Sequence, residues 1–140
     1  MAVNIIETDW QHDKDALVSL RTAVFINEQH VPESLEWDEH DESASHFLAI
    51  NDQHQPVGCI RLLPSGQVSR LCVLSDYRNS GIGRALLAEA ERHAVAREMD
   101  EIFLHAQTQA TSFYESAGFS VSGGIFMDAN IPHRQMFKPL

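Results

Sequence analysis

The chain has 140 residues, 44% of them hydrophobic and 21% charged, which fits one folded domain over residues 1–140. Its formal net charge of −10 argues against nucleic acid as a partner, and it serves solubility alone or suits a cationic acceptor such as an amine. No stretch resembles a signal peptide or a membrane span, so we expect a cytoplasmic chain without a membrane partner.

The first half of the chain predicts strands on both sides of a helix and an acidic segment. Asp13 is the expected N-cap of a helix that runs to about Phe25. The segment that follows is polar and acidic, and Pro32 interrupts it. Strands are expected at 3–7, 45–52, 56–64 and 67–74, with turns between the last three.

The second half predicts two helices and three further strands. Apolar residues recur every four positions from Ile82 to Ala94, which predicts a helix from Gly81 to Arg97. A strand is expected at 101–107, then a short helix that ends at Gly118, and two strands in the tail. This order predicts an α/β (α+β) domain with a mixed sheet.

The turn between the strand at 67–74 and the next helix has the features of an anion site. The first amides of a helix have no internal partner and carry partial positive charge. Gly81 and Gly83 have no Cβ, so a phosphate can approach the amides of residues 79–84. Arg78 and Arg84 add positive charge at the rim. Neither a third glycine at position 86 nor a Walker lysine is present, so a nucleotide-binding fingerprint is not supported.

The stretch RLCVLSDYRNSGIGRALL resembles the acetyl-CoA signature of the GNAT N-acetyltransferases. FYESAGF, at 113–119, resembles the usual end of that family's fourth helix, and the order of elements is similar throughout. LRTAVFINEQHVPESLEWDEHD, LHAQ and IPHRQM are similar to a small bacterial ElaA-like or YjcF-like subfamily. The resemblance implies the GNAT acyl-CoA N-acyltransferase fold, a mostly antiparallel sheet of six to seven strands flanked by about four helices. It also implies acetyl transfer from acetyl-CoA to a primary amine by direct attack, with no metal and with a homodimer as a common state.

The resemblance also implies roles for individual residues. The implied cofactor-binding residues are Leu71, Cys72, Val73, Arg78, Asn79, Ser80, Gly81, Ile82, Gly83, Arg84 and Gln107. The backbone of the first three would lie along the pantetheine arm, and an amide near Leu71 or Cys72 would polarise the thioester carbonyl. Tyr114 is implied as the general acid for the departing thiolate, and its alternative is a packing role in the short helix.

The acceptor side of the site is less defined by sequence. The acidic segment 33–42 is either a solvated loop or a wall that orients an ammonium group, with Glu36 and Asp38 as the expected contacts. His133 is a third candidate on this side. The strand before the glycines has no carboxylate, so the general base is left among Glu36, Asp38, His105 and His133.

The two cysteines lie in apolar runs and are expected as buried free thiols, so Cys72 is expected in the core and not as a nucleophile.

Two alternatives to acetylation of an amine remain. The whole chain could be a CoA-binding module without catalytic activity. It could also transfer a longer acyl group or acylate a different nucleophile. The acceptor, a small-molecule or peptide amine, is not identified by the sequence.

Overall fold

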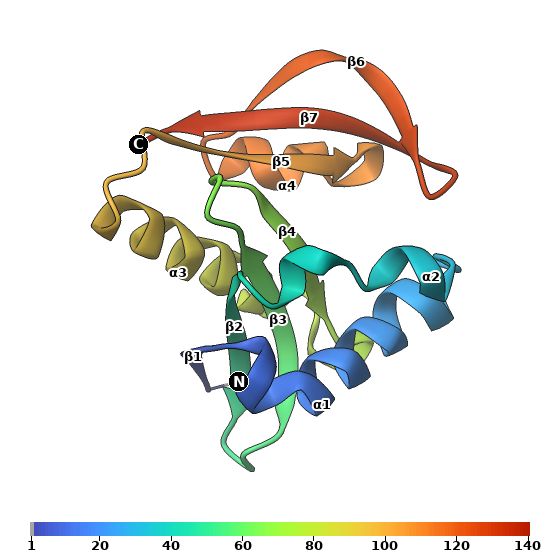
Figure 1. The fold of residues 1–140 in the computed structure, drawn as a ribbon, viewed down its shortest axis with the longest axis vertical. Helices are drawn as coiled ribbons and strands as arrows, with labels where there is room; N and C mark the ends of the chain where they lie inside the picture. The colour runs from blue at the N-terminus through green and yellow to red at the C-terminus, as the bar shows by residue number, and fades with distance from the viewer. Residues whose placement is uncertain (1) are drawn as a thin grey trace.

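The computed structural model describes residues 2–140, and within them it contains seven strands and four α-helices (Figure 1). The strands are β1 (Val3–Thr8), β2 (Ser45–Asn51), β3 (Pro56–Leu62), β4 (Val68–Val73), β5 (Glu101–Gln107), β6 (Ser120–Asp128) and β7 (Ile131–Pro139). The helices are α1 (Trp10–Arg21), α2 (Glu33–Glu36), α3 (Ile82–Ala96) and α4 (Thr111–Ser116). A π-helical segment, Thr22–Glu28, continues α1. None of the helices within residues 2–140 has the length and apolar character needed to cross a lipid bilayer.

The strands divide into two antiparallel sheets that meet at one point. The four-stranded sheet has the order β1-β2-β3-β4, and the three-stranded sheet has the order β5-β7-β6. A parallel bridge joins Gln67, just before β4, to Phe103 of β5. Beyond this bridge β4 and β5 diverge (Figure 1). The predicted α/β architecture, with mostly antiparallel strands and about four helices, is confirmed, and the structure adds the division into two sheets.

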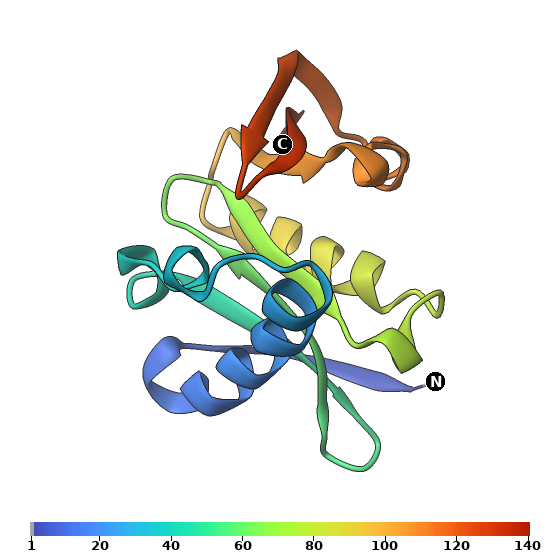
Figure 2. The ribbon, with the colours of Figure 1, turned by 90° about the vertical axis from the view of Figure 1, so that its right-hand side faces the viewer.

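The four-stranded sheet is covered on both faces. Phe47 of β2 and Ile60 of β3 pack in one apolar cluster with α3, whereas their neighbours Leu48 and Cys59 pack in a second cluster with α1. Successive side chains of a strand point to opposite faces, so α1 and α3 must lie on opposite sides of the sheet (Figure 2). This sandwich fixes β4 between the helix layers while its outer edge stays near the second sheet.

The predicted start of α1 at Asp13 is wrong by four residues. Asp9 is the N-cap, and its carboxylate accepts the backbone N–H of His12 at 2.8 Å. The helix begins earlier because Trp10 is buried against the sheet and must already be in its first turn. Asp13 itself departs from helical geometry, with φ −127° and ψ 30°, and its carboxylate accepts the hydroxyl of Thr8 at 2.5 Å.

The ends of α3 and α4 agree with the sequence pattern. Gly81 caps the start of α3 and Arg97 caps its end, which confirms the predicted span. Gly118 follows the last turn of α4 with φ +99°, and the N–H of Phe119 reaches back to the carbonyl of Tyr114 at 3.1 Å. A glycine in this left-handed position is the expected helix stop, so the chain leaves α4 here and enters β6.

Candidate functional site

One edge of β4 is left open where the two sheets separate. β3 pairs with the inner edge, through Cys59 opposite Cys72 and Arg61 opposite Ser69. The register shifts between these pairs, and Arg70 lies in the shift with φ +56°. On the outer edge, no strand within residues 2–140 pairs with β4 after the bridge at Gln67. The backbone groups on this edge can therefore pair with an extended ligand, as an added strand would.

The start of α3 is a second place where backbone groups are available. In the described chain no side chain caps this helix, and its first helical bond runs from the N–H of Ala85 to the carbonyl of Gly81. The preceding amides therefore have no partner within the helix, and they lie at its positive end. Gly81 has φ +87°, and a Cβ built there meets nothing within 4 Å. Backbone conformation, not crowding, is the reason for glycine at this position.

The two arginines at the rim of this turn are held by protein groups. Arg78 forms a two-point contact with the carboxylate of Glu28, at 2.8 and 3.0 Å, and also donates to the carbonyl of Val73. Arg84 lies over the ring of Phe113 at 5.8 Å and donates to the hydroxyl of Ser116. Both side chains thus have fixed positions beside the uncapped amides, and a phosphate there would compete with Glu28 for Arg78.

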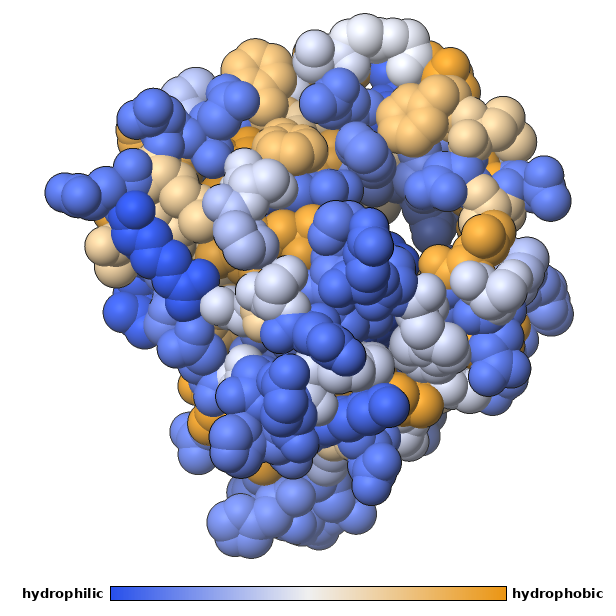
Figure 3. All heavy atoms as spheres, in the orientation of Figure 1, coloured by the Kyte–Doolittle hydropathy of each residue, from blue (hydrophilic) through white to orange (hydrophobic). Residues whose placement is uncertain are grey.

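A cavity of about 270 Å³ lies between β4 and the second sheet, and Figure 3 shows a hollow on this face of the molecule. It is lined by Phe25, Gln29, Val31, Leu35, Glu36, Gln67, Val68, Ser69, Arg70, Leu71, Leu104, His105, Gln107, Ala110, Tyr114, Asp128, Ala129, Ile131 and His133. The structure therefore brings Leu71, Gln107, Tyr114, Glu36 and His133, which sequence placed in the site, around one space. Asp38 and Cys72 lie outside this lining.

Tyr114 projects from α4 into the cavity between two aromatic rings. Its ring meets Phe113 at 5.0 Å and Phe119 at 6.0 Å between centroids, both edge to face. Burial raises the pKa of Tyr114 to about 12. The phenol therefore carries its proton throughout the neutral range and can donate it. The ring contacts show the packing role of Tyr114, and its role as a proton donor stays a prediction.

The second sheet contributes two histidines and a glutamine to the lining of the cavity. His133 of β7 is 8% exposed, and its Nδ1 lies 2.7 Å from the carbonyl oxygen of Ile131. His105 of β5 lies edge-on to Phe126 at 5.2 Å, and its partial burial lowers its pKa. Gln107, at the end of β5, donates to the side-chain oxygen of Gln29 at 2.7 Å. The lowered pKa of His105 favours its neutral ring, and the role of either histidine as a base stays a prediction.

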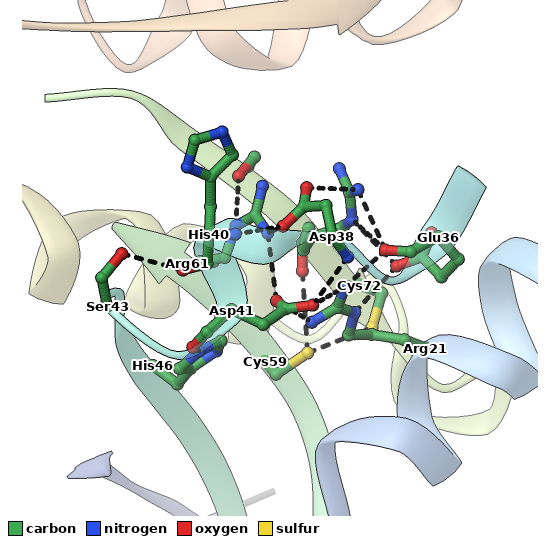
Figure 4. A network of polar contacts seen from close by, with 12 residues as sticks. Arg21, Glu36, Asp38, His40, Asp41, Ser43, His46, Cys59, Arg61 and Cys72 are labelled. Carbon is green, nitrogen blue, oxygen red and sulfur yellow. Dashed lines mark hydrogen bonds and ion pairs between the residues drawn. The ribbon is translucent and has the colours of Figure 1, made fainter. Parts of the chain in front are cut away.

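The acidic wall of the cavity contains a buried network of charged side chains (Figure 4). This arginine–carboxylate network consists of Arg21, Arg61, Arg70, Glu36, Asp38 and Asp41. Arg21 contacts Glu36 at 2.8 Å and Asp41 at 2.7 Å, and all three side chains are almost inaccessible to water. Arg61 contacts Asp38 at 2.7 Å and Asp41 at 3.0 Å. The segment is anchored to α1 and β3 by charge.

Arg70 connects this network to the irregular part of β4. Its guanidinium contacts the carboxylates of Glu36 at 2.9 Å and Asp38 at 3.2 Å, and also donates to the carbonyl of Glu36. The same residue has the left-handed backbone at the register shift. A non-glycine residue there carries strain, which the side-chain contacts offset. The network therefore helps to shape the open edge of β4.

The network corrects only part of the view of the acidic segment as a solvated loop, because Glu33, Glu39 and Glu42 are exposed. Glu36 and Asp41 are 3% and 1% exposed, because both carboxylates are paired with arginines. Burial raises the pKa of Glu36. Burial also opposes ionisation of Asp38 and Asp41, but hydrogen bonds from Arg61 and Arg21 outweigh it and hold both pKa values below the ordinary range. The contact of Glu36 and Asp38 with an acceptor stays a prediction.

The two cysteines are buried free thiols, as predicted. Their sulfur atoms lie 3.5 Å apart, on directly opposed positions of β3 and β4. The hydrogen bond with Cys59 and burial together hold the pKa of Cys72 well above its ordinary value. A buried, protonated thiol is a poor nucleophile, so the geometry favours the expected core role for Cys72.

Sequence reasoning did not find the three arginines of the network. One signal was present, because Arg21, the last residue of α1, lies four residues after Leu17 and three before Val24 of the π-helical segment, and both of these are buried. A charged residue in the middle of an apolar face needs a buried partner. The partners lie in the acidic segment, but no local pattern indicated which carboxylates they are.

Comparisons with known proteins agree with this geometry. Residues 10–140 match a family model described as an acetyltransferase (GNAT) domain. An uncharacterized N-acetyltransferase of Bacillus subtilis, YjcF, is 36% identical over 96% of this chain and 97% of its own length. A crystal structure of an acyl-CoA N-acyltransferase from Pseudomonas aeruginosa, 27% identical, covers 98% of this chain and 99% of that one with a TM-score of 0.87. Escherichia coli ElaA, at 23% identity over 98% of this chain and 99% of its own, shares the fold with the same TM-score.

Proposed function

The chain belongs to the GNAT N-acetyltransferase family, and we propose that it transfers the acetyl group of acetyl-CoA to a primary amine. The observation that carries this proposal is the open edge of β4, which borders the cavity and leads to the uncapped start of α3. An extended thioester arm can pair with such an edge, and a pyrophosphate suits the amides of a helix N-terminus. The sequence and the shape of the site thus favour the same donor.

The proposed contacts with the donor are mostly backbone contacts. Leu71, Cys72 and Val73 pair with the pantetheine arm through their N–H and C=O groups. The amides of residues 79–84 hold the pyrophosphate, and the arginines at both ends of this turn add charge. Gln107 faces the arm from the other wall of the cavity, where its position is fixed by Gln29. A backbone amide near Leu71 or Cys72 polarises the thioester carbonyl.

The proposed reaction is a direct attack of the amine nitrogen on the thioester carbonyl carbon. The C–N bond forms, the C–S bond breaks, and the sulfur leaves as a thiolate that needs a proton. Tyr114 supplies that proton: its phenol is protonated at neutral pH and lines the cavity beside β4. Glu36 and Asp38, on the acidic side, are proposed to favour an acceptor that arrives as a cation.

Ligand-dependent stability tests the donor. At a concentration 100 times its Kd, acetyl-CoA should stabilise the folded chain by roughly 2.7 kcal/mol, measured as a rise in the unfolding midpoint. Inorganic pyrophosphate and ATP at the same concentration are the controls for unspecific anion binding. An unchanged midpoint with acetyl-CoA would contradict the proposal at its first step.

Release of free CoA thiol with a panel of small-molecule and peptide amines tests the transfer. Turnover with at least one amine is expected. Binding of acetyl-CoA without turnover on any amine would instead support a CoA-binding module. Repeating the assay with longer acyl-CoA donors tests which acyl group is preferred. A higher kcat/KM for a longer group would mean that acetyl-CoA is not the preferred donor.

Replacement of Tyr114 by phenylalanine tests the acid. The change keeps the ring between Phe113 and Phe119, so acetyl-CoA binding should persist while kcat falls by roughly 10²-fold or more. If Tyr114→Phe turned over at the normal rate at every pH, the hydroxyl would have no part in the reaction.

A further inference from the structure

Of the two histidines that line the cavity, His133 has a tautomer fixed by its surroundings. Its Nδ1 lies 2.7 Å from the carbonyl oxygen of Ile131, and a carbonyl oxygen can only accept a hydrogen bond. Nδ1 therefore carries the proton, and in the neutral ring Nε2 keeps its lone pair. The ring also stacks on Phe126, with 5.8 Å between centroids and 24° between planes. Packing and the hydrogen bond together hold the imidazole in one orientation.

The Nε2 atom of His133 is accessible, and His133 lines the cavity. Among residues 2–140 this atom has no hydrogen-bond partner. It is also not fully enclosed, because Arg134 Nε is the one enclosed side-chain atom without a partner in this range. His133 lines the cavity together with Tyr114 and the outer edge of β4. A lone pair that is oriented, accessible and beside the proposed reaction site is what a general base requires.

The other candidates for a base are less suited. The carboxylate of Glu36 already accepts from Arg21 and Arg70 at the same oxygen, at 2.8 and 2.9 Å. Asp38 lies outside the lining of the cavity and is bound to arginines. For His105, no hydrogen bond within the described chain selects a tautomer, and its ring contacts are the edge of Phe126 and a tilted Phe103. His133 combines a fixed tautomer with an acceptor atom that no arginine among residues 2–140 contacts, whereas Glu36 is held by two guanidinium groups.

We propose that His133 is the general base of the transfer and that its Nε2 removes the proton that the acceptor ammonium must lose before its nitrogen can attack. This inference rests on the proposed function, because it assumes an amine acceptor in this cavity. Other titratable and charged groups face the same space from every element around it. They are Glu36 from α2, Arg70 from β4, His105 from β5, Tyr114 from α4 and Asp128 from β6.

The protons of the reaction balance with these two residues. The acceptor enters as R–NH₃⁺, and His133 takes one proton to give R–NH₂ and an imidazolium. The nitrogen then attacks the carbonyl carbon, the C–N bond forms, and the C–S bond breaks as Tyr114 protonates the sulfur. The nitrogen of the addition product loses a second proton, which restores the phenol of Tyr114. The imidazolium releases its proton to solvent, so the products are the amide, CoA thiol and one proton.

The kinetic test is the pH dependence of kcat/KM in His133→Gln, with His105→Gln as the matched control. With an alkylamine acceptor, His133→Gln should lose roughly 10²- to 10⁴-fold in kcat/KM and should lose the acidic limb that a histidine base produces. His105→Gln should keep the acidic limb of the profile even if its kcat/KM is lower overall. With an acceptor of the hydrazine class, which is already neutral at the assay pH, His133→Gln should lose much less. Wild-type pH dependence in His133→Gln, or loss of the limb only in His105→Gln, would overturn the assignment.

Failure of the inference can be separated from failure of the proposed function. A wild-type chain that binds acetyl-CoA but acetylates no amine contradicts the transfer itself, and the base assignment falls with it. Acetyl-CoA must still raise the unfolding midpoint of His133→Gln, which shows that the variant is folded.

The tautomer can be measured in the unmodified chain, independently of any variant. ¹⁵N NMR of the imidazole groups should show the proton of neutral His133 on Nδ1, with Nε2 unprotonated. A proton on Nε2 would leave no lone pair for the acceptor and would overturn the proposal even if His133→Gln did not fold.

Discussion

The two walls of the cavity are built on different physical principles. The β4 wall offers backbone groups: an open strand edge, which borders the cavity, and beyond the cavity lining the amides at the start of α3. The acidic wall, in the segment 33–42, carries Glu36, Asp38 and Asp41, whose charges are already bound by three arginines. A backbone wall is specified by a short local stretch with glycine at a left-handed position. A charged wall depends on partners from α1, β3 and β4 that are distant in sequence.

The two walls meet at Arg70. Its backbone forms the irregular position of β4, and its side chain belongs to the arginine–carboxylate network. The acidic segment therefore supports the β4 wall through Arg70, in addition to its proposed contact with the acceptor. The difference between the walls predicts that changes in the network reduce stability most, while changes in the backbone wall reduce donor affinity most.

The largest expected effect is that of Arg21→Met. The substitution leaves Glu36 and Asp41 buried with one guanidinium fewer, and loss of one partner of a buried ion pair costs roughly 3–5 kcal/mol. Urea denaturation monitored by circular dichroism measures the change. Arg97→Ala, which removes a half-exposed pair with Glu7, is the control and should cost less than about 1 kcal/mol. Equal losses in both variants would mean that the network contributes no more than a surface ion pair.

A smaller effect is expected for Gly81→Ala on the backbone wall. An alanine at φ +87° should cost roughly 1–2 kcal/mol, since the left-handed region is unfavourable for residues with a Cβ. Gly83→Ala is the matched control, because its Cβ meets Phe113 and Val73 only at 3.7 and 3.8 Å, ordinary contact distances. Gly83→Ala should therefore keep its stability but weaken acetyl-CoA binding, as isothermal titration would show. Full affinity in Gly83→Ala would argue against a phosphate close to these amides.

The same contrast explains how much of the molecule could be predicted from sequence. The span of α3, the stop at Gly118 and the turn at 79–84 were predicted, because each depends on neighbouring residues in the chain. The start of α1 was placed at Asp13 instead of Asp9, since both are acceptable N-caps and only the burial of Trp10 decides between them. The pairing within the acidic segment was not predicted, because a carboxylate carries no local sign of which arginine will bind it.

The pH dependence of stability should show a contribution from His46, which lies behind the network. Its Nε2 contacts the carbonyl of Asp41 at 2.8 Å, and burial lowers the pKa of His46 in the folded chain. The unfolded chain then binds the proton more readily, so this contribution to stability is present above the unfolded pKa and is lost as pH falls through about 6.5. Denaturation midpoints at pH 7.5 and 5.5 should differ less in His46→Gln than in the wild-type chain. An equal difference in both chains would mean that titratable groups other than His46 cause the pH dependence of stability.

The smallest effect is expected for Cys72→Ala, which tests whether β4 acts through its backbone alone. The thiol is buried against Cys59, outside the lining of the cavity, and its raised pKa keeps it protonated. Removal of the sulfur should cost on the order of 1 kcal/mol of stability and leave kcat for acetyl transfer within about twofold of wild type. A backbone amide at position 72 survives the change, so donor binding should survive as well. If turnover were lost while acetyl-CoA still bound, an acyl-cysteine intermediate would have to replace direct attack. β4 would then act through a side chain as well as through its backbone, which would contradict the distinction between the two walls.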